Sequence, residues 1–222
     1  MTEVGTSSDS HMQEFRIALF GPQVTHWTHE ELSELQSNLL RNTKFAFLIT
    51  TLLRLRSFHS TLEEDAGIFN HLIEARLDEL RGFAAGDNIP DPQNLSQTVL
   101  APLTVLSQIV NLARLTEDNK GHDGCLKFQV AQGFCIGFLS AAALASSSDW
   151  AELEQNASNA VRLAFCVGTV IDAEDLSHAP PDRAVAVSVR WKTASDRTYL
   201  ETSLDLFPNV SFLESSYIPC SK

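Results

Sequence analysis

One short stretch constrains the fold of this chain more than any other: residues 127–148, which read KFQVAQGFCIGFLSAAALASSS. An apolar run that predicts a strand leads into Gly133, Cys135 and Gly137, and an alanine- and leucine-rich tract that favours a helix follows at once. A single cysteine between glycines, where a strand gives way to a helix, is typical of a nucleophile elbow, G-x-S-x-G with cysteine in place of serine. The stretch therefore predicts an α/β fold with a thiol at Cys135.

The elbow pattern also predicts how the thiol of Cys135 would be activated. Glycine neighbours let the backbone pass close by in a tight, strained turn. The first turn of the following helix offers free N–H groups and the positive end of the helix dipole, which favour a thiolate and can hold an oxyanion. A second interpretation stays open, because a buried cysteine can simply pack at a crowded strand–helix junction.

Composition and charge exclude several classes of function. The net charge is -12, with no large lysine or arginine cluster, which argues against nucleic acid as a partner. The apolar tract at 134–145 is too short to span a membrane, so no membrane association is expected. The four cysteines have no C-x-x-C spacing, which argues against a metal site and against a disulfide-rich secreted fold. A reducing, cytoplasmic setting is expected.

The pattern along the chain predicts a leader, a body and a short tail. Residues 1–14 are polar and are predicted to be disordered, and 15–182 form a helix-rich α/β body that carries Cys135. Residues 183–222 follow a Pro-rich linker and predict one β-α-β unit, too small to bury both of its faces alone. The predicted strands are 15–20, 126–130, 184–191 and 210–218, and the predicted helices are 29–40, 45–56, 62–80, 95–115, 150–172 and 195–207.

Three stretches together resemble one protein family. Residues 20–24 (FGPQV), 38–66 and 132–142 (QGFCIGFLSAA) are similar to the starter-unit acyl-carrier-protein transacylase (SAT) domain of fungal non-reducing polyketide synthases. The similarity covers nearly all of the chain after the leader. It implies a malonyl-acyltransferase-like fold, in which an α/β-hydrolase-like large subdomain is followed by a ferredoxin-like small subdomain. Residues 183–222 would then be an incomplete small subdomain.

The resemblance implies an acyl transfer through an acyl-Cys135 intermediate. The acyl donor would be acyl-CoA or a fatty acid synthase, the acceptor an acyl carrier protein, and the substrate acyl group would be linked to CoA or phosphopantetheine, with no bound cofactor or metal. The residues it implies are Cys135 as nucleophile, Gln23 and the backbone N–H of Ile136 at the oxyanion hole, and Gly21, Phe134 and Gly137 in substrate binding.

The general base is the part of the family's site that the chain is expected to lack. The resemblance implies a base histidine beyond the small subdomain, and a C-terminally truncated chain ending at Lys222 does not reach it. Only His178 follows Cys135, and it does not match that position. General-base assistance is typically worth ~10²–10⁴-fold. The favoured interpretation is acyl transfer that is impaired by the loss of this base. Two alternatives stay open: a non-catalytic remnant or carrier-protein-binding module of the same fold, and a thioesterase-like hydrolase.

Overall fold

The computed structural model describes residues 16–23, 27–66, 70–118 and 128–177, together with Thr198 and Thr202. The chain divides into two compact units, Met1–Ala179 and Pro180–Lys222. In the second unit Thr198 and Thr202 are helical, inside the predicted helix 195–207. The predicted leader 1–14 and the predicted strands 184–191 and 210–218 lie outside the described residues. The account below concerns the first unit.

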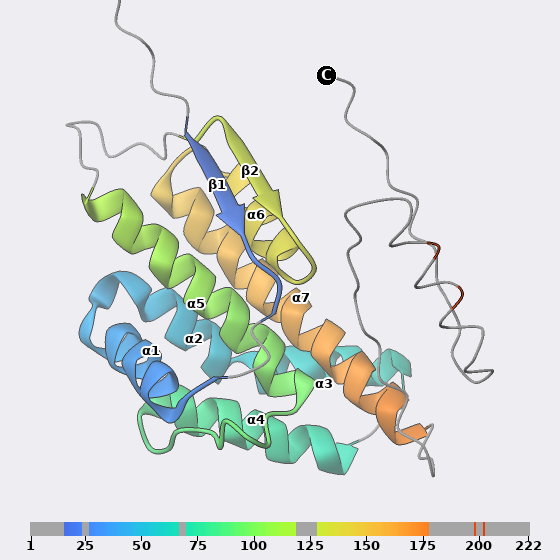
Figure 1. Cartoon of the computed structure of the whole chain (residues 1–222). Coiled ribbons are helices and arrows are strands. Elements are labelled where there is room, and N and C mark those ends of the chain that lie inside the picture. Colours follow the sequence, from blue (N-terminus) through green and yellow to red (C-terminus); the bar gives the residue numbers. More distant parts are fainter. Residues whose placement is uncertain are drawn as a thin grey trace, which may run out of the picture. The chain divides into compact units, whose positions relative to one another are not determined.

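Two strands form a small parallel sheet in the first unit (Figure 1). Strand β1 (Ile17–Phe20) pairs with β2 (Val130–Gly133), with Ile17 opposite Val130 and Phe20 opposite Gly133. The predicted strand 15–20 contains β1. The predicted strand 126–130 was wrong in its limits, because β2 begins at Val130 and runs up to the cysteine turn. The carboxyl ends of both strands therefore lie at the same edge of the sheet.

The described part of the first unit is otherwise mostly helical, in agreement with the predicted helix-rich α/β class. The helices are α1 (His29–Arg41), η1 (Thr43–Phe45), α2 (Ala46–Leu53), α3 (Leu55–Ala66), α4 (Asn70–Ala85), α5 (Gln97–Asp118), α6 (Gly137–Ala145) and α7 (Trp150–Ser177). Thr28 and Glu31 have the sequence spacing that predicts a capping box at the start of α1, and the box is present. The Thr28 hydroxyl accepts from the Glu31 N–H at 3.1 Å, and the Glu31 carboxylate accepts from the Thr28 N–H at 2.8 Å.

Two predicted helices have wrong limits. The predicted helix 45–56 is divided at Arg54, whose N–H is shared between the carbonyls of Thr50 and Thr51, so α2 ends there and α3 starts at Leu55. The predicted helix 62–80 starts inside α3 and ends inside α4. At Arg54 the apolar periodicity continues without a glycine or proline, so the sequence carries no local signal for that division. Between α3 and α4 it does carry one, because Gly67 directly follows Ala66, the last residue of α3.

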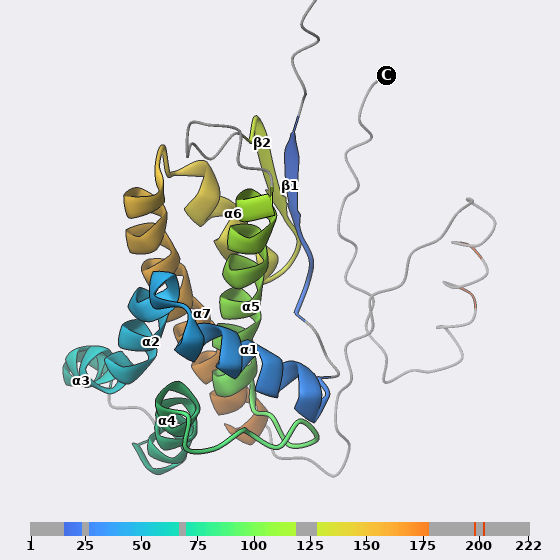
Figure 2. The ribbon, with the colours of Figure 1, turned by 90° about the vertical axis from the view of Figure 1, so that its left-hand side faces the viewer.

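Helices α5 and α7 run side by side through the unit, and α6 packs on α7 and on both strands (Figures 1 and 2). By length and composition, Gln97–Thr116 in α5 could cross a membrane, and its most apolar window is 72% buried inside the unit. This helix is longer than the tract 134–145 on which the sequence-based expectation about membranes rested. A buried central helix of a globular core passes the same test of length and composition, so α5 is weak grounds for a membrane span.

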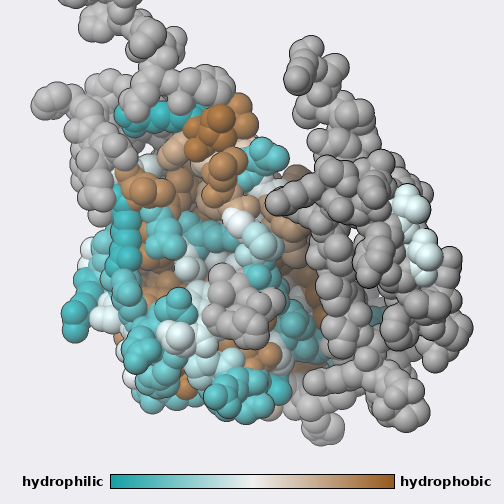
Figure 3. All heavy atoms as spheres, in the orientation of Figure 1, coloured by the Kyte–Doolittle hydropathy of each residue, from teal (hydrophilic) through white to brown (hydrophobic). Residues whose placement is uncertain are grey.

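Two apolar surfaces are exposed on the described unit. The strands bury Ala18 and Phe20 toward α6 but leave Ile17, Leu19 and Val130 exposed, and Figure 3 shows a hydrophobic patch over the sheet. The sequence pattern predicts one apolar face for the helix that begins at Trp150, marked by Leu153, Val161, Leu163, Val167 and Val170. That prediction is correct for Leu153 and Val161, which are buried. The prediction is wrong for Leu163, Val167 and Val170, which are exposed and form an outer apolar stripe on α7. The periodicity marks two apolar faces on α7, and only one of them packs on α5.

Candidate functional site

Cys135 occupies a sharp turn between β2 and α6. Its φ is 56°, and no other residue except glycine has a positive φ in the part of the chain that the structure describes. Hydrogen bonds close the turn on both sides: the Gly137 N–H donates to the Phe134 carbonyl at 3.1 Å, and the Phe138 N–H donates to the Cys135 carbonyl at 3.0 Å. A left-handed backbone conformation at a cysteine raises the free energy of the folded state by roughly 1–2 kcal/mol. The turn holds the thiol in the exposed, strained position that an elbow requires.

The two glycines that flank Cys135 permit close backbone packing. A Cβ atom on Gly133 would lie under 3.0 Å from the Gly137 carbonyl, and one on Gly137 would lie under 3.0 Å from the Gly21 and Phe20 carbonyls. The first contact tightens the elbow itself. The second lets the start of α6 approach the end of β1. Gly137 is therefore a packing position buried beneath the elbow, whereas Phe134 is 54% exposed beside the thiol.

The loop after β1 carries Gly21 and Gln23 to the same edge of the sheet as the elbow. The Phe134 N–H donates to the Phe20 carbonyl at 3.0 Å, which extends the strand pairing up to the residue before Cys135. The Gln23 side-chain amide donates to the Gln97 side chain at 2.5 Å, at the first residue of α5. The structure thus brings the predicted residues Gly21 and Gln23 to the end of the sheet where Cys135 lies.

Asp172 of α7 anchors the part of α5 that holds Gln23. Its carboxylate accepts hydrogen bonds from the backbone N–H groups of Gln97 at 2.9 Å and Thr98 at 2.8 Å, and from the Thr98 hydroxyl at 2.6 Å. These bonds satisfy orphan donors at a helix start. Gly168 allows the close approach, since a Cβ there would lie under 3.0 Å from the Gln97 carbonyl. Sequence reasoning missed Gln97, because its partners are about 75 residues away.

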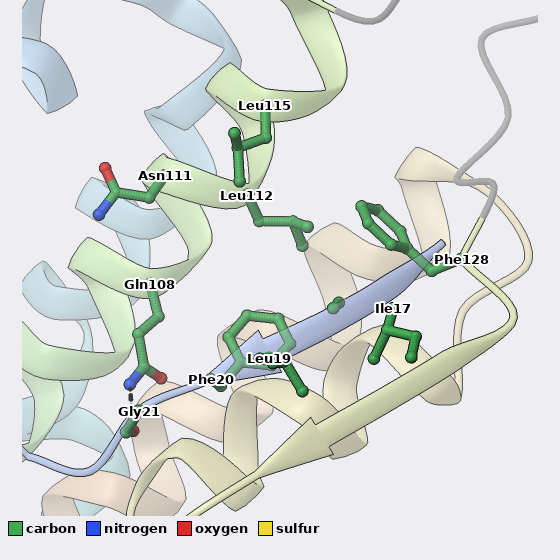
Figure 4. A pocket seen from close by; sticks show the side chains of 10 residues that line it. Ile17, Leu19, Phe20, Gly21, Gln108, Asn111, Leu112, Leu115 and Phe128 are labelled. Atoms are coloured by element: carbon green, nitrogen blue, oxygen red, sulfur yellow. Dashed lines mark hydrogen bonds between the residues drawn. The ribbon is translucent and has the colours of Figure 1, made fainter. Parts of the chain in front are cut away.

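A shallow hollow of about 290 Å³ lies between β1 and α5 (Figure 4). Apolar side chains, including Leu19, Leu112 and Phe128, form much of its wall, and Gly21 lies at one end. Of the residues predicted to bind substrate, Gly21 lines this hollow, whereas Phe134 and Gly137 belong to the elbow. Among the described residues, no group of three or more His, Cys, Asp or Glu could hold a metal ion.

The site consists of a thiol elbow beside a glutamine-bearing loop, and comparison with known protein families shows which family the chain belongs to. The family model described as "Starter unit:ACP transacylase in aflatoxin biosynthesis" matches residues 18–197. The chain belongs to this SAT family. The matched range includes both the loop after β1 and the Cys135 elbow. Members of this family act in the starter-unit step of polyketide biosynthesis, with an acyl carrier protein as partner.

Relatives of this SAT chain are fungal non-reducing polyketide synthases. It is 36% identical over 187 residues to the non-reducing polyketide synthase adrD of Penicillium rubens, across 84% of this chain and 7% of that protein. It is 30% identical over 203 residues to nvfA of Aspergillus novofumigatus, across 91% and 8%. A 5-methylorsellinic acid synthase of Aspergillus terreus is 28% identical over 200 residues, across 86% and 8%. The chain thus spans less than a tenth of the length of these relatives.

The histidines whose side chains are described in this SAT chain are His29 and His59. His59, on α3, is buried, with its ring edge-on to Phe165 of α7 at 6.0 Å between centroids. His29 is exposed at the start of α1. This packing gives His59 a structural role between α3 and α7. His178, the histidine that follows Cys135, lies outside the described residues.

The two described cysteines should differ in their reactivity with pH. Burial raises the pKa of the Cys166 thiol above its ordinary value, whereas Cys135 is exposed. Because thiolate is the nucleophile, we expect iodoacetamide to alkylate Cys135 well before Cys166 at pH 7, and the gap to narrow as the pH rises and Cys166 ionises. Peptide mass spectrometry over time measures both rates. In denaturing urea the two rates should converge, and equal rates in the native protein at pH 7 would contradict the expectation.

Proposed function

We propose that this chain is a starter-unit acyltransferase that carries an acyl group on Cys135 from acyl-CoA or a fatty acid synthase to an acyl carrier protein. The observation that carries the proposal is the left-handed Cys135 turn between β2 and α6, packed through Gly133 and Gly137. A core residue has no need of such strain, whereas a nucleophile that must stand out from the end of a strand does. The exposure of the thiol supports the same conclusion.

The proposed chemistry is two successive thioester exchanges. The Cys135 thiolate attacks the acyl carbonyl, the carbon–sulfur bond to CoA breaks, and CoA leaves as a thiolate. The phosphopantetheine thiol of the carrier protein then attacks the acyl-Cys135 carbonyl and releases Cys135. Each incoming thiol releases one proton and each departing thiolate takes one up, so the cycle is balanced and close to isoenergetic.

The proposed oxyanion hole lies between the loop after β1 and the start of α6. The backbone N–H of Ile136 follows the nucleophile directly, and Ile136 stands at the N-cap of α6, where backbone donors are free. Gln23 would complete the hole from the loop, oriented by its bond to Gln97. The exposed rings of Phe134 and Phe138 next to the thiol supply apolar surface suited to an acyl chain.

The finer architecture belongs to the same proposal. Residues 15–182 would form the large subdomain of a malonyl-acyltransferase-like fold, 183–222 part of a ferredoxin-like small subdomain, and 1–14 a leader. The protein would work in the cytoplasm, without a bound cofactor or metal and without nucleic acid or membrane as a partner.

Intact-mass spectrometry after mixing the full chain with hexanoyl-CoA or acetyl-CoA tests the proposal. We expect an adduct of one acyl group that disappears in Cys135→Ala and persists in Cys166→Ala, the matched loss of another thiol. Transfer of the acyl group to a carrier protein would complete the cycle. Absence of any adduct would contradict acyl transfer and favour a non-catalytic module. Rapid release of free acid without transfer would instead indicate a hydrolase.

A further inference from the structure

Gln108, near the middle of α5, connects two segments of the site that are far apart in the sequence. Its side-chain N–H donates to the Gly21 carbonyl at 2.9 Å, and its side-chain oxygen accepts from the Ser140 hydroxyl at 2.6 Å. Figure 4 shows the first of these bonds, at the end of the hollow. Gly21 belongs to the loop that bears Gln23, and Ser140 belongs to the helix that the Cys135 elbow begins.

The same two segments also meet directly. The Gly21 carbonyl lies so close to Gly137 that a Cβ on Gly137 would not fit. Ser140 follows Gly137 by three residues and so lies on the same side of α6, where it is fully buried. The Gly21 carbonyl is therefore in contact with Gly137 and held by Gln108, and Gln108 is in turn bonded to α6 through Ser140. These contacts connect Gly21, Gln108, Ser140 and Gly137 to one another at the junction between the loop and the elbow.

We propose that Gln108 is a positioning residue that fixes the separation between the Gly21–Gln23 loop and the Cys135 elbow. A primary amide suits this place because one group both donates to a carbonyl and accepts from a hydroxyl. The catalytic part of the inference rests on the proposed function. If Cys135 and Gln23 act on one acyl carbonyl, a small change in their separation lowers the rate, since displacements of about 1 Å can cost ~10²-fold.

The test uses the full chain with Gln108→Met, Ser140→Ala and the double variant. Methionine keeps the length of glutamine without its amide. Thr104→Val is the matched control, because the Thr104 hydroxyl is buried on the same helix but bonds only to the Leu100 carbonyl of α5. Amide hydrogen exchange is measured on peptides covering 16–23 and 130–140. Acylation by hexanoyl-CoA and alkylation by iodoacetamide are measured at Cys135.

We expect faster exchange in both peptides of Gln108→Met and an acylation rate lower by on the order of tenfold. Alkylation should change by less than about twofold, because it needs the thiolate but not the loop. The double variant should acylate no more slowly than Gln108→Met, since both changes break one connection and the second removes an unpartnered hydroxyl. Thr104→Val should leave exchange in both peptides unchanged.

Unchanged exchange in both peptides of Gln108→Met would overturn the inference whatever the chemistry of the protein. Acylation and alkylation that fall by the same factor would overturn it too, since that pattern indicates general loosening of the fold. If the wild-type chain forms no acyl adduct, the proposed function fails, and the exchange measurement alone decides whether Gln108 holds the loop.

Discussion

Gly137→Ala is expected to destabilise the protein by about 3 kcal/mol, at the upper end of the usual range for overpacking. The added Cβ would lie under 3.0 Å from two backbone carbonyls, those of Gly21 and Phe20, and neither can move as a flexible side chain would. The start of α6 would have to move away from the end of β1. For a chain of this size the change corresponds to a drop of about 6–12 °C in Tm, measurable by thermal melting followed by circular dichroism.

The sign of the change in stability distinguishes a crowded glycine from an unobstructed one. At an unobstructed helical position, replacing glycine by alanine stabilises a protein by up to about 1 kcal/mol. A higher Tm for Gly137→Ala would therefore contradict the close packing of α6 on the β1 loop. Gly21→Ala is the matched control: a Cβ at Gly21 would meet nothing within 4 Å, and its φ is not positive. We expect its stability to stay within about 0.5 kcal/mol of the wild type.

The parts of the site that the sequence predicted are encoded locally. The elbow depends on Gly133, Cys135 and Gly137 within five residues, and the capping box on Thr28 and Glu31 within four. In both cases the residue types are set by backbone geometry at the same place, a strained turn or unpaired N–H groups. Such features can be predicted from one sequence because no distant partner decides them.

The parts that the sequence did not predict depend on distant partners. Gln97, Gln108, Ser140 and Asp172 hold the loop and helices around the elbow, and their hydrogen bonds join residues separated by 32 to 87 positions. Nothing in a local pattern distinguishes Gln108 from a solvent-facing glutamine. The exposed stripe on α7 was missed for a related reason, since periodicity finds an apolar face but does not say whether another element covers it.

Cys135→Gly is expected to abolish the acyl adduct and yet to make the fold more stable than Cys135→Ala does. Both variants lack sulfur, so their difference reports the backbone alone. Alanine at φ 56° keeps a penalty of roughly 1–2 kcal/mol that glycine does not have. The greater freedom of glycine in the unfolded chain offsets about 0.4–1 kcal/mol of that gain. The net difference at the middle of these ranges is roughly 0.8 kcal/mol, so we expect the glycine variant to unfold about 2–3 °C above the alanine variant.

Ala75→Gly, on the exposed face of α4, is the matched control for this pair. There glycine should lower the free energy of unfolding by about 1 kcal/mol relative to alanine, which is the usual order of stability within a helix. A reversal of that order at position 135 would show that the strain is real and that the native cysteine maintains it at the expense of stability. If alanine is the more stable residue at both positions, the left-handed turn is wrong, and with it the main structural support for Cys135 as nucleophile. A position that destabilises its own fold and leaves a thiol exposed is accounted for by chemistry, because packing alone would select glycine there.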